Sequence, residues 1–276
     1  MDALIANARK PAEDKVVCVI NTSLSSSVDR SARRIAAAVT EISGLRTVIV
    51  HYSLASRGNM KRVRPVAIIL SGQGDPWTSY RESSLRDVKS LIRAADYPLL
   101  GICGGHQLVA LAFGGTVDRI RRVRPGEGYD GCLRESGYRR ARVVADDPVL
   151  GRKGSELFVC ESHYDEVKRE PAGFVTLATN ATSRIQAMRH RSKLIYGVQF
   201  HPDIWDKAHP AGKEILERFL QLCSKWEGRR GRTQAPRASV GSEHGWKRIS
   251  RSRPTDQLVH RIRMEGRLRC EDIAER

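Results

Sequence analysis

Long hydrophobic runs are missing from this sequence, which argues against a membrane-spanning helix. No segment of the 276 residues approaches the run of about 18 apolar side chains that such a helix needs. Residues 1–15 also lack the apolar stretch of a secretory signal peptide. The expected location is therefore the cytoplasm.

Cysteine pairs with the spacing of a metal site are missing too. The six cysteines are scattered, and none forms a Cys-x-x-Cys pair. In a reducing compartment such cysteines are expected to be free thiols, with neither a disulfide framework nor a zinc site. No metal or other cofactor is expected.

Acidic residues are fewer than basic ones. The sequence has 31 aspartates and glutamates against 48 lysines and arginines, which gives a formal net charge of +17. A chain this basic often has an anionic partner such as nucleic acid. Arginine is densest in residues 228–276, where apolar clusters are few, so a basic, disordered tail is the simpler interpretation. Nucleic-acid or partner binding through this tail is the alternative, and it is not favoured because no nucleic-acid-binding motif is present.

Residues 16–227 have the apolar pattern of one α/β domain, preceded by an extension over residues 1–15. Strands are expected at residues 16–20, 47–52, 66–70 and 98–102, with helices at 29–41 and 81–95. This alternation predicts a doubly wound, mostly parallel sheet of the flavodoxin-like type, flanked by helices. The second half indicates short antiparallel strands and a closing helix, at residues 141–144, 156–160, 175–178, 185–189, 194–198 and 213–226.

The stretch Gly101-Ile-Cys103-Gly-Gly105 has the pattern of a sharp strand-to-helix turn with a nucleophile at its apex. Glycines are needed there because side chains would collide with the adjacent strand and helix. The turn places the Cys103 sulfur at a helix N-terminus, where the dipole favours thiolate, and it leaves the Gly104 N–H free to face an oxyanion. An ordinary buried cysteine or a phosphate-binding turn would give the same local pattern, so catalysis needs a partner base.

A candidate base follows in the segment Gln199-Phe-His201-Pro-Asp203, where His201 ends a strand that Pro202 stops. Residues two apart in an extended segment point to the same side. Asp203 can therefore accept a hydrogen bond from one imidazole nitrogen while the other nitrogen faces the thiol. The sequence predicts a nucleophile, a base and an orienting acid in Cys103, His201 and Asp203.

These segments together resemble the class I glutamine amidotransferases, and in particular the glutaminase domain of GMP synthetases. GICGGHQ around Cys103 and GVQFHPD around His201 are similar to the two signatures of the family. Residues 68–76 resemble its oxyanion-strand loop, and residues 161–167 resemble its Ser-His-Gly-Asp segment. The four segments occur in the order of the family, and the resemblance covers residues 16–226.

The resemblance implies a mechanism. Cys103 would attack the side-chain amide of glutamine, and His201 would move the thiol proton to the leaving ammonia. N–H groups of Gly104 and the Gly72 region would hold the oxyanion. The substrate's amino-acid end would be positioned by Gln107, Ser162, His163 and Tyr164. Water would then release glutamate, and ammonia would pass to a partner synthetase or ligase.

Three positions depart from the family pattern. Asp203 stands where the family usually has glutamate, which shortens the reach to His201 by one methylene group. The sequence Ser-Gly-Gln-Gly at residues 71–74 replaces the commoner Gly-Gly-Pro of the oxyanion loop. Tyr164 replaces a glycine, and a bulkier side chain there could change the choice of substrate.

Two other functions remain open on the sequence. A stand-alone γ-glutamyl hydrolase would use the same thioester chemistry without a partner. A catalytically silent fold would instead serve as a regulatory module, or as a nucleic-acid-binding module through its basic tail.

Overall fold

The computed structural model describes residues 15–233 and Cys270. Its main sheet has nine strands: β1 (Val16–Asn21), β2 (Arg46–His51), β3 (Ala67–Leu70), β4 (Leu99–Ile102), β6 (Glu135–Val143), β7 (Glu156–His163), β9 (Phe174–Thr179), β10 (Ala187–His190) and β11 (Ile195–Val198). A second sheet has two strands, β5 (Thr116–Arg119) and β8 (Asp165–Arg169). The helices are α1 (Arg30–Ser43), α2 (Arg57–Val63), α3 (Glu82–Ala94), α4 (Gly104–Ala112) and α5 (Ala211–Thr233), with short 3₁₀ turns at Tyr52–Leu54 and Trp77–Ser79.

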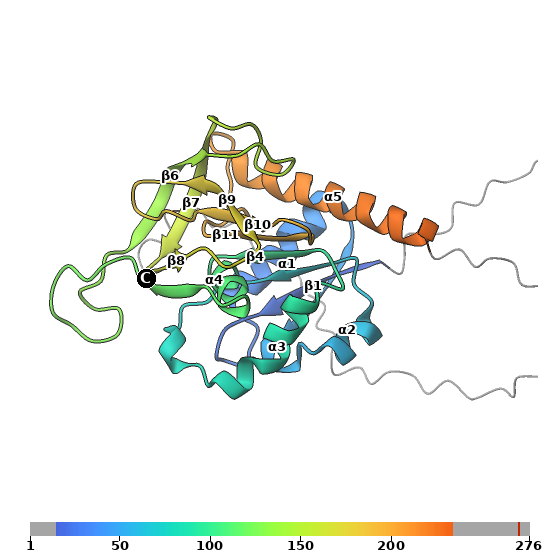
Figure 1. Cartoon of the computed structure of the whole chain (residues 1–276), viewed down its shortest axis with the longest axis horizontal. Coiled ribbons are helices and arrows are strands. Elements are labelled where there is room, and N and C mark those ends of the chain that lie inside the picture. The colour runs from blue at the N-terminus through green and yellow to red at the C-terminus, as the bar shows by residue number, and fades with distance from the viewer. Residues whose placement is uncertain (1–14, 234–269, 271–276) are drawn as a thin grey trace, which may run out of the picture.

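The main sheet is parallel in its first half and antiparallel in its second (Figure 1). Its order is β2-β1-β3-β4-β11-β10-β9-β6-β7. The first five strands pair in parallel, and every pair from β11 onward is antiparallel. The order β2-β1-β3-β4 is that of flavodoxin-like sheets. The predicted doubly wound sheet with antiparallel additions in the second half is confirmed.

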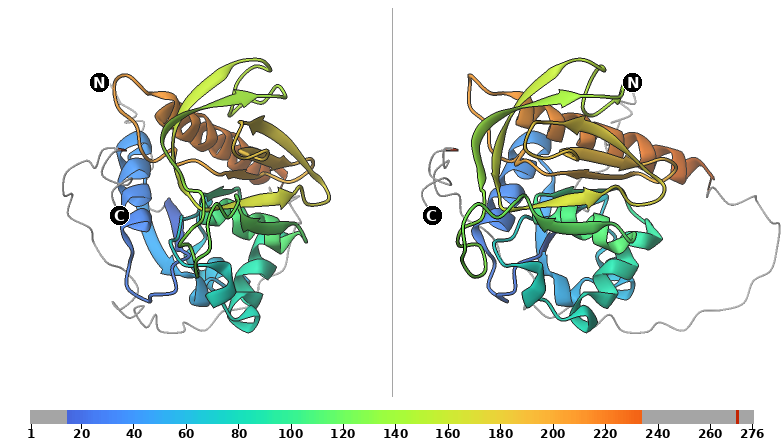
Figure 2. Two further views of the ribbon diagram at one scale, coloured as in Figure 1. Left: turned by 90° about the vertical axis from the view of Figure 1, so that its left-hand side faces the viewer. Right: turned by 60° about the vertical axis from the view of Figure 1, so that its left-hand side comes forward.

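Helices cover both faces of the sheet because alternate strand residues point to opposite sides. Val17 and Val19 of β1 lie in a core that includes residues of α1 and α5. Cys18 and Ile20 lie in a second core, with residues of α3 and α4. Figure 2 shows the two helix layers with the strands between them. In such a sheet ligands bind at the carboxyl ends of the parallel strands, which is where β4 and β11 deliver their next residues.

Helix α1 begins and ends where the sequence predicts a helix. The Asp29 carboxylate accepts a hydrogen bond from the Ala32 N–H at 2.7 Å, which satisfies one of the free donors of the first turn. Gly44 ends the helix in the left-handed conformation, with φ at 67°. Ile35 and Val39 are fully buried and fix the rotation of the helix about its axis. The rotation decides which α1 side chains reach the candidate site.

Several elements are absent from the sequence prediction. Helix α2 has seven residues and buries only Met60, so it has no clear apolar stripe. Strands β5 and β8 are mostly polar and pair with each other rather than with the main sheet. Helix α5 extends beyond the expected end at residue 226, so the first residues of the expected tail are helical. Apart from Cys270, the rest of that tail lies outside the described residues, as do residues 1–14.

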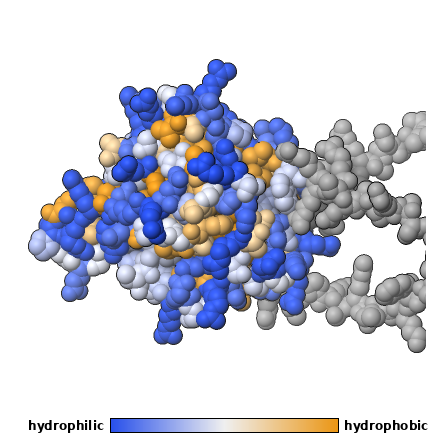
Figure 3. All heavy atoms as spheres, viewed as in Figure 1, coloured by the Kyte–Doolittle hydropathy of each residue, from blue (hydrophilic) through white to orange (hydrophobic). Residues whose placement is uncertain are grey.

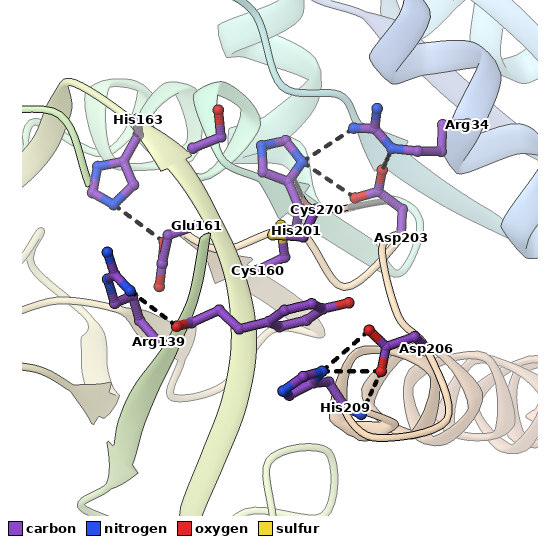
Figure 4. The surroundings of a disulfide bond; sticks show 12 residues. Arg34, Arg139, Cys160, Glu161, His163, His201, Asp203, Asp206, His209 and Cys270 are labelled. Carbon is purple, nitrogen blue, oxygen red and sulfur yellow. Dashed lines mark hydrogen bonds and ion pairs between the residues drawn. A yellow bond between two sulfur atoms is a disulfide. The ribbon is translucent and has the colours of Figure 1, made fainter. Parts of the chain in front are cut away.

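The expectation of free thiols throughout is wrong. Cys160 of β7 forms a disulfide with Cys270, although 110 residues separate them in the sequence, while the other four cysteines are free. The bridge packs against Ile204 and lies beside the candidate site, because the Cys160 carbonyl accepts the His201 N–H at 2.8 Å (Figure 4). A pairing over this separation leaves no spacing signal in the sequence.

Hydrophilic side chains predominate on the face shown in Figure 3, with smaller hydrophobic patches between them. Among the described residues the large exposed hydrophobic side chains are Leu24, Leu54, Val123 and Phe158, which come from different segments of the chain. Within residues 15–233, none of the helices is both long and apolar enough to cross a bilayer.

Candidate active site

Cys103 lies at the apex of a sharp turn between β4 and α4. Its backbone has φ 52° and ψ −109°, a conformation that non-glycine residues rarely adopt. A Cβ on Gly101 would lie 2.4 Å from the Gly105 carbonyl oxygen, and a Cβ on Gly105 would lie 2.5 Å from that of Leu70. Both contacts are with backbone atoms, so the predicted need for glycine on both sides of Cys103 is confirmed.

The Cys103 thiol is buried, and only 4% of the residue is exposed. Burial raises its pKa to about 12; the nearby Glu161 carboxylate adds to this, and the Gly104 N–H opposes it. The N–H at the start of α4 favours thiolate as expected, but desolvation by burial outweighs it. The thiol faces the Ser162 carbonyl at 3.8 Å and the Gln199 amide nitrogen at 3.7 Å. A nucleophile in this state needs a base.

His201 and Cys103 meet at Gly72. A Cβ on Gly72 would lie 3.1 Å from Cε1 of the His201 ring and 3.4 Å from Cβ of Cys103. Both side chains therefore approach the same point, where a Cβ on residue 72 would fit only tightly. The turn after β4, the segment after β11 and the loop after β3 converge here, as the parallel strand order requires.

The acid side of the site contains a residue that sequence reasoning missed. Oδ1 of Asp203 lies 3.3 Å from Nδ1 of His201, and Oδ2 accepts a hydrogen bond from Nε of Arg34 at 2.5 Å (Figure 4). Burial alone would raise the pKa of the Asp203 carboxyl, but the charge of Arg34 and the hydrogen bond with His201 hold it well below its usual range. Arg34 belongs to α1, and its sequence neighbourhood gives no sign of this contact.

The two residues predicted to hold an oxyanion lie around the loop of residues 71–74. Gly104 packs against this loop, since a Cβ there would lie 2.6 Å from Cγ of Gln73 and 3.1 Å from its nitrogen. The loop is anchored by buried hydrogen bonds from the Thr22 N–H to Oγ of Ser71, at 3.1 Å, and from that Oγ to the Gly72 carbonyl, at 2.9 Å. The loop thus approaches Cys103 through Gly72 and contacts Gly104 through Gln73, despite its Ser-Gly-Gln-Gly sequence.

Gln107 is buried and fully engaged within the protein. Its amide nitrogen donates to the Asp165 carbonyl at 2.7 Å and to the Gln199 side chain at 3.1 Å. Its amide oxygen accepts from the Trp77 indole at 2.7 Å. Gln199 was not singled out from the sequence, although it precedes His201 by two residues in an extended segment and so points to the same side.

His163 lies between two buried carboxylates. Its Nδ1 donates to the Asp165 carbonyl at 2.9 Å, and its Nε2 lies 3.1 Å from Glu135 and 3.2 Å from Glu161. Burial opposes a charge on the ring, but the hydrogen bonds to Glu135 and Glu161 raise the pKa of His163 to about 10. Among the described residues, the group whose spacing could hold a metal ion consists of Glu135, Glu161 and His163. Both ring nitrogens face acceptors, so the protonated ring offers no metal ligand, and we assign none.

Ser162 and Tyr164 connect the site to the loop of residues 120–134. Oγ of Ser162 accepts a hydrogen bond from Arg134 at 3.0 Å. The Tyr164 ring stacks on Tyr129 with 4.6 Å between ring centroids, and the Arg134 guanidinium lies 5.5 Å from the Tyr164 centroid. The tyrosine that replaces the usual glycine therefore anchors a loop at the edge of the site.

Comparison with known proteins is consistent with this geometry. Residues 28–222 match the family model of the class I glutamine amidotransferases. The glutamine-hydrolysing GMP synthase subunit of Archaeoglobus fulgidus is 39% identical over 134 residues, which is 49% of this chain and 66% of that protein. The same-named subunit of Thermococcus kodakarensis is 36% identical over 166 residues, covering 60% and 80% of the two chains. Alignments with two further relatives of that name cover 64% and 65% of their lengths, so the match spans just under two thirds of several of these relatives.

Solved structures support the same fold. A Thermoplasma acidophilum protein described as a subunit of a GMP synthase superimposes with a TM-score of 0.64 at 26% identity, covering 79% of this chain and 98% of that one. A glutamine amidotransferase from Thermotoga maritima, at 17% identity, shares the fold with a TM-score of 0.53 over 79% of this chain and 86% of that one. The family model covers most of the described residues, including the turn at Cys103 and the segment at His201. This chain belongs to the class I glutamine amidotransferase family.

Proposed function

We propose that this protein is a glutaminase that hydrolyses the side-chain amide of glutamine through a Cys103 thioester and supplies ammonia to a partner synthetase. The observation that carries the proposal is the convergence of Cys103, His201 and Gly72 at the carboxyl ends of β4, β11 and β3. Asp203 and the N–H of Gly104 complete the set of groups that acyl transfer needs.

The reaction proceeds in two halves. His201 takes the proton of the Cys103 thiol as sulfur attacks the amide carbon, and it then gives this proton to the leaving nitrogen, so that ammonia and a thioester form. His201 next takes a proton from water, whose oxygen attacks the thioester. Collapse of this second adduct releases glutamate and returns the proton to sulfur. The N–H groups of Gly104 and the Gly72 region stabilise the oxyanion of both adducts.

Ser162, His163, Tyr164 and Gln107 form the wall beside the nucleophile and position the amino-acid end of glutamine. His163 and Gln107 do this by fixing the wall, because their polar atoms are bonded within the protein. The names of the relatives support a GMP-forming synthetase as the acceptor of ammonia. The stand-alone γ-glutamyl hydrolase is the alternative that shares this chemistry.

The test is glutamate and ammonia formation by the full chain, alone and with the synthetase component of a GMP synthase. We expect hydrolysis that rises when the synthetase is added, is abolished in Cys103→Ala and is unchanged in Cys132→Ser, which alters a free cysteine of the loop beside the site. Cleavage of γ-glutamyl amides without a partner, with no response to the synthetase, would favour the alternative. Absence of hydrolysis under all conditions would leave only the silent module. The binding of nucleic acid by the tail concerns residues that lie mostly outside the described part of the chain.

A further inference from the structure

Arg34 reaches the His201–Asp203 pair from a distant part of the sequence. Its Nε donates to Oδ2 of Asp203, and its Nη2 lies 3.4 Å from Nδ1 of His201, over sequence separations of 169 and 167 residues (Figure 4). The other Asp203 oxygen, Oδ1, lies 3.3 Å from the same ring nitrogen. The carboxylate is thus held between a guanidinium and an imidazole.

The fold makes this contact specific. The Asp203 side chain is fully buried, and that of Arg34 is only 16% exposed. Helix α1 is fixed by the Asp29 cap and by its buried apolar face, so Arg34 is directed toward the site. The neighbouring Arg33 is exposed on the same helix and serves as a matched control.

We propose that Arg34 is a positioning residue for the His201–Asp203 pair, an inference that rests on the proposed function. Aspartate is one methylene group shorter than the usual glutamate, so its carboxylate reaches less far toward His201 and needs another group to hold it in place. The hydrogen bond from Arg34 fixes one carboxylate oxygen and leaves the other directed at Nδ1. A charge-assisted hydrogen bond of this kind is stronger and more directional than a neutral one.

Arg34 also sets the charge of the pair. Asp203 and Arg34 from α1 lie against the His201 ring, and Cys103 lies beside it at Gly72. Glu161 of β7, which pairs with His163, acts on Cys103. The guanidinium stabilises the Asp203 carboxylate and opposes a further positive charge on the ring beside it. The Asp203 carboxyl therefore stays ionised to a lower pH than it would without Arg34.

The test compares Arg34→Met with Arg33→Met and Arg34→Lys. We expect the acidic limb of the kcat/KM profile for glutamine to move up by about one pH unit in Arg34→Met, because an adjacent charge has been removed. Its plateau kcat should fall about 10-fold with little change in KM, since orientation of the base is lost. Arg34→Lys should retain the wild-type limb, and Arg33→Met should match the wild type in every respect.

A measurement without turnover separates this inference from the proposed function. NMR titration of the Asp203 carboxyl should show proton uptake at higher pH in Arg34→Met than in the wild type, because the charge that lowers its pKa has been removed. This shift in a chain that does not hydrolyse glutamine would refute the proposed function and leave the positioning role intact. An active wild type, with a folded Arg34→Met whose acidic limb and Asp203 titration equal those of Arg33→Met, would overturn the positioning role. If Arg34→Met does not fold, Arg34→Gln takes its place, because it removes the charge while keeping a hydrogen-bond donor. The same two outcomes then support or overturn the positioning role.

Discussion

Gly101→Ala is the substitution whose effect the structure defines most sharply. A Cβ at position 101 would lie 2.4 Å from the Gly105 oxygen, 2.6 Å from the Gly105 carbonyl carbon and 2.8 Å from the His106 nitrogen. All three are backbone atoms of the first turn of α4, so no flexible side chain can yield. An ordinary Cβ contact begins near 3.4 Å, and the start of α4 would have to retreat by about 1 Å.

We expect this retreat to cost about 1–3 kcal/mol of the free energy of unfolding, the usual range for overpacking a close-packed interior. It should also slow reaction at Cys103 about 100-fold, because a displacement of about 1 Å is enough to misalign reacting groups. The assays are urea unfolding and the rate at which a glutamine-like electrophile modifies Cys103. Gly58→Ala is the matched control: position 58 is in α2, its nearest neighbour is Oγ of Ser56 at 3.8 Å, and alanine there should stabilise by up to about 1 kcal/mol. A Gly101→Ala protein with wild-type stability and a wild-type modification rate would refute the described turn.

Two further predictions concern β7. Glu161→Gln removes a carboxylate that raises the pKa of Cys103, so this pKa should fall and iodoacetamide should alkylate Cys103 several-fold faster at pH 9. The control Glu156→Gln, at an exposed position, should leave the alkylation rate unchanged. Equal alkylation rates in the two variants would contradict the effect assigned to Glu161. Cys270→Ser removes the disulfide to Cys160 and should lower the free energy of unfolding by about 2–4 kcal/mol under oxidising conditions. In the presence of reductant the variant and the wild type should have the same free energy of unfolding. Equal free energies without reductant would show that the disulfide does not form or does not stabilise the fold.

The parts of the site that could be predicted are those that lie within short segments. Gly101, Cys103 and Gly105 lie in one short segment, so the local sequence alone predicts a sharp bend there. His201 and Asp203 lie two residues apart at a strand end, which fixes the side to which both point. The parallel order of the sheet then brings the two segments together, because both follow buried parallel strands.

The parts that could not be predicted depend on contacts across the fold. Arg34 meets Asp203 only because the apolar face of α1 fixes how that helix lies on the sheet. Cys160 and Cys270 pair over a separation that carries no spacing rule. The raised pKa of Cys103 depends on burial and on Glu161, which no local pattern reveals. The sequence of the turn predicted a favourable helix end but not the desolvation that outweighs it.

The proposed mechanism depends on a buried Cys103 thiol, paired with His201, as the nucleophile. The most direct measurement treats the full chain with a glutamine-like electrophile, such as a diazoketone analogue, and locates the modified residue by mass spectrometry. We expect one modification, on Cys103, that glutamine prevents and that is strongly slowed in His201→Ala. Modification of another cysteine, or labelling of Cys103 at the same rate in His201→Ala, would contradict it.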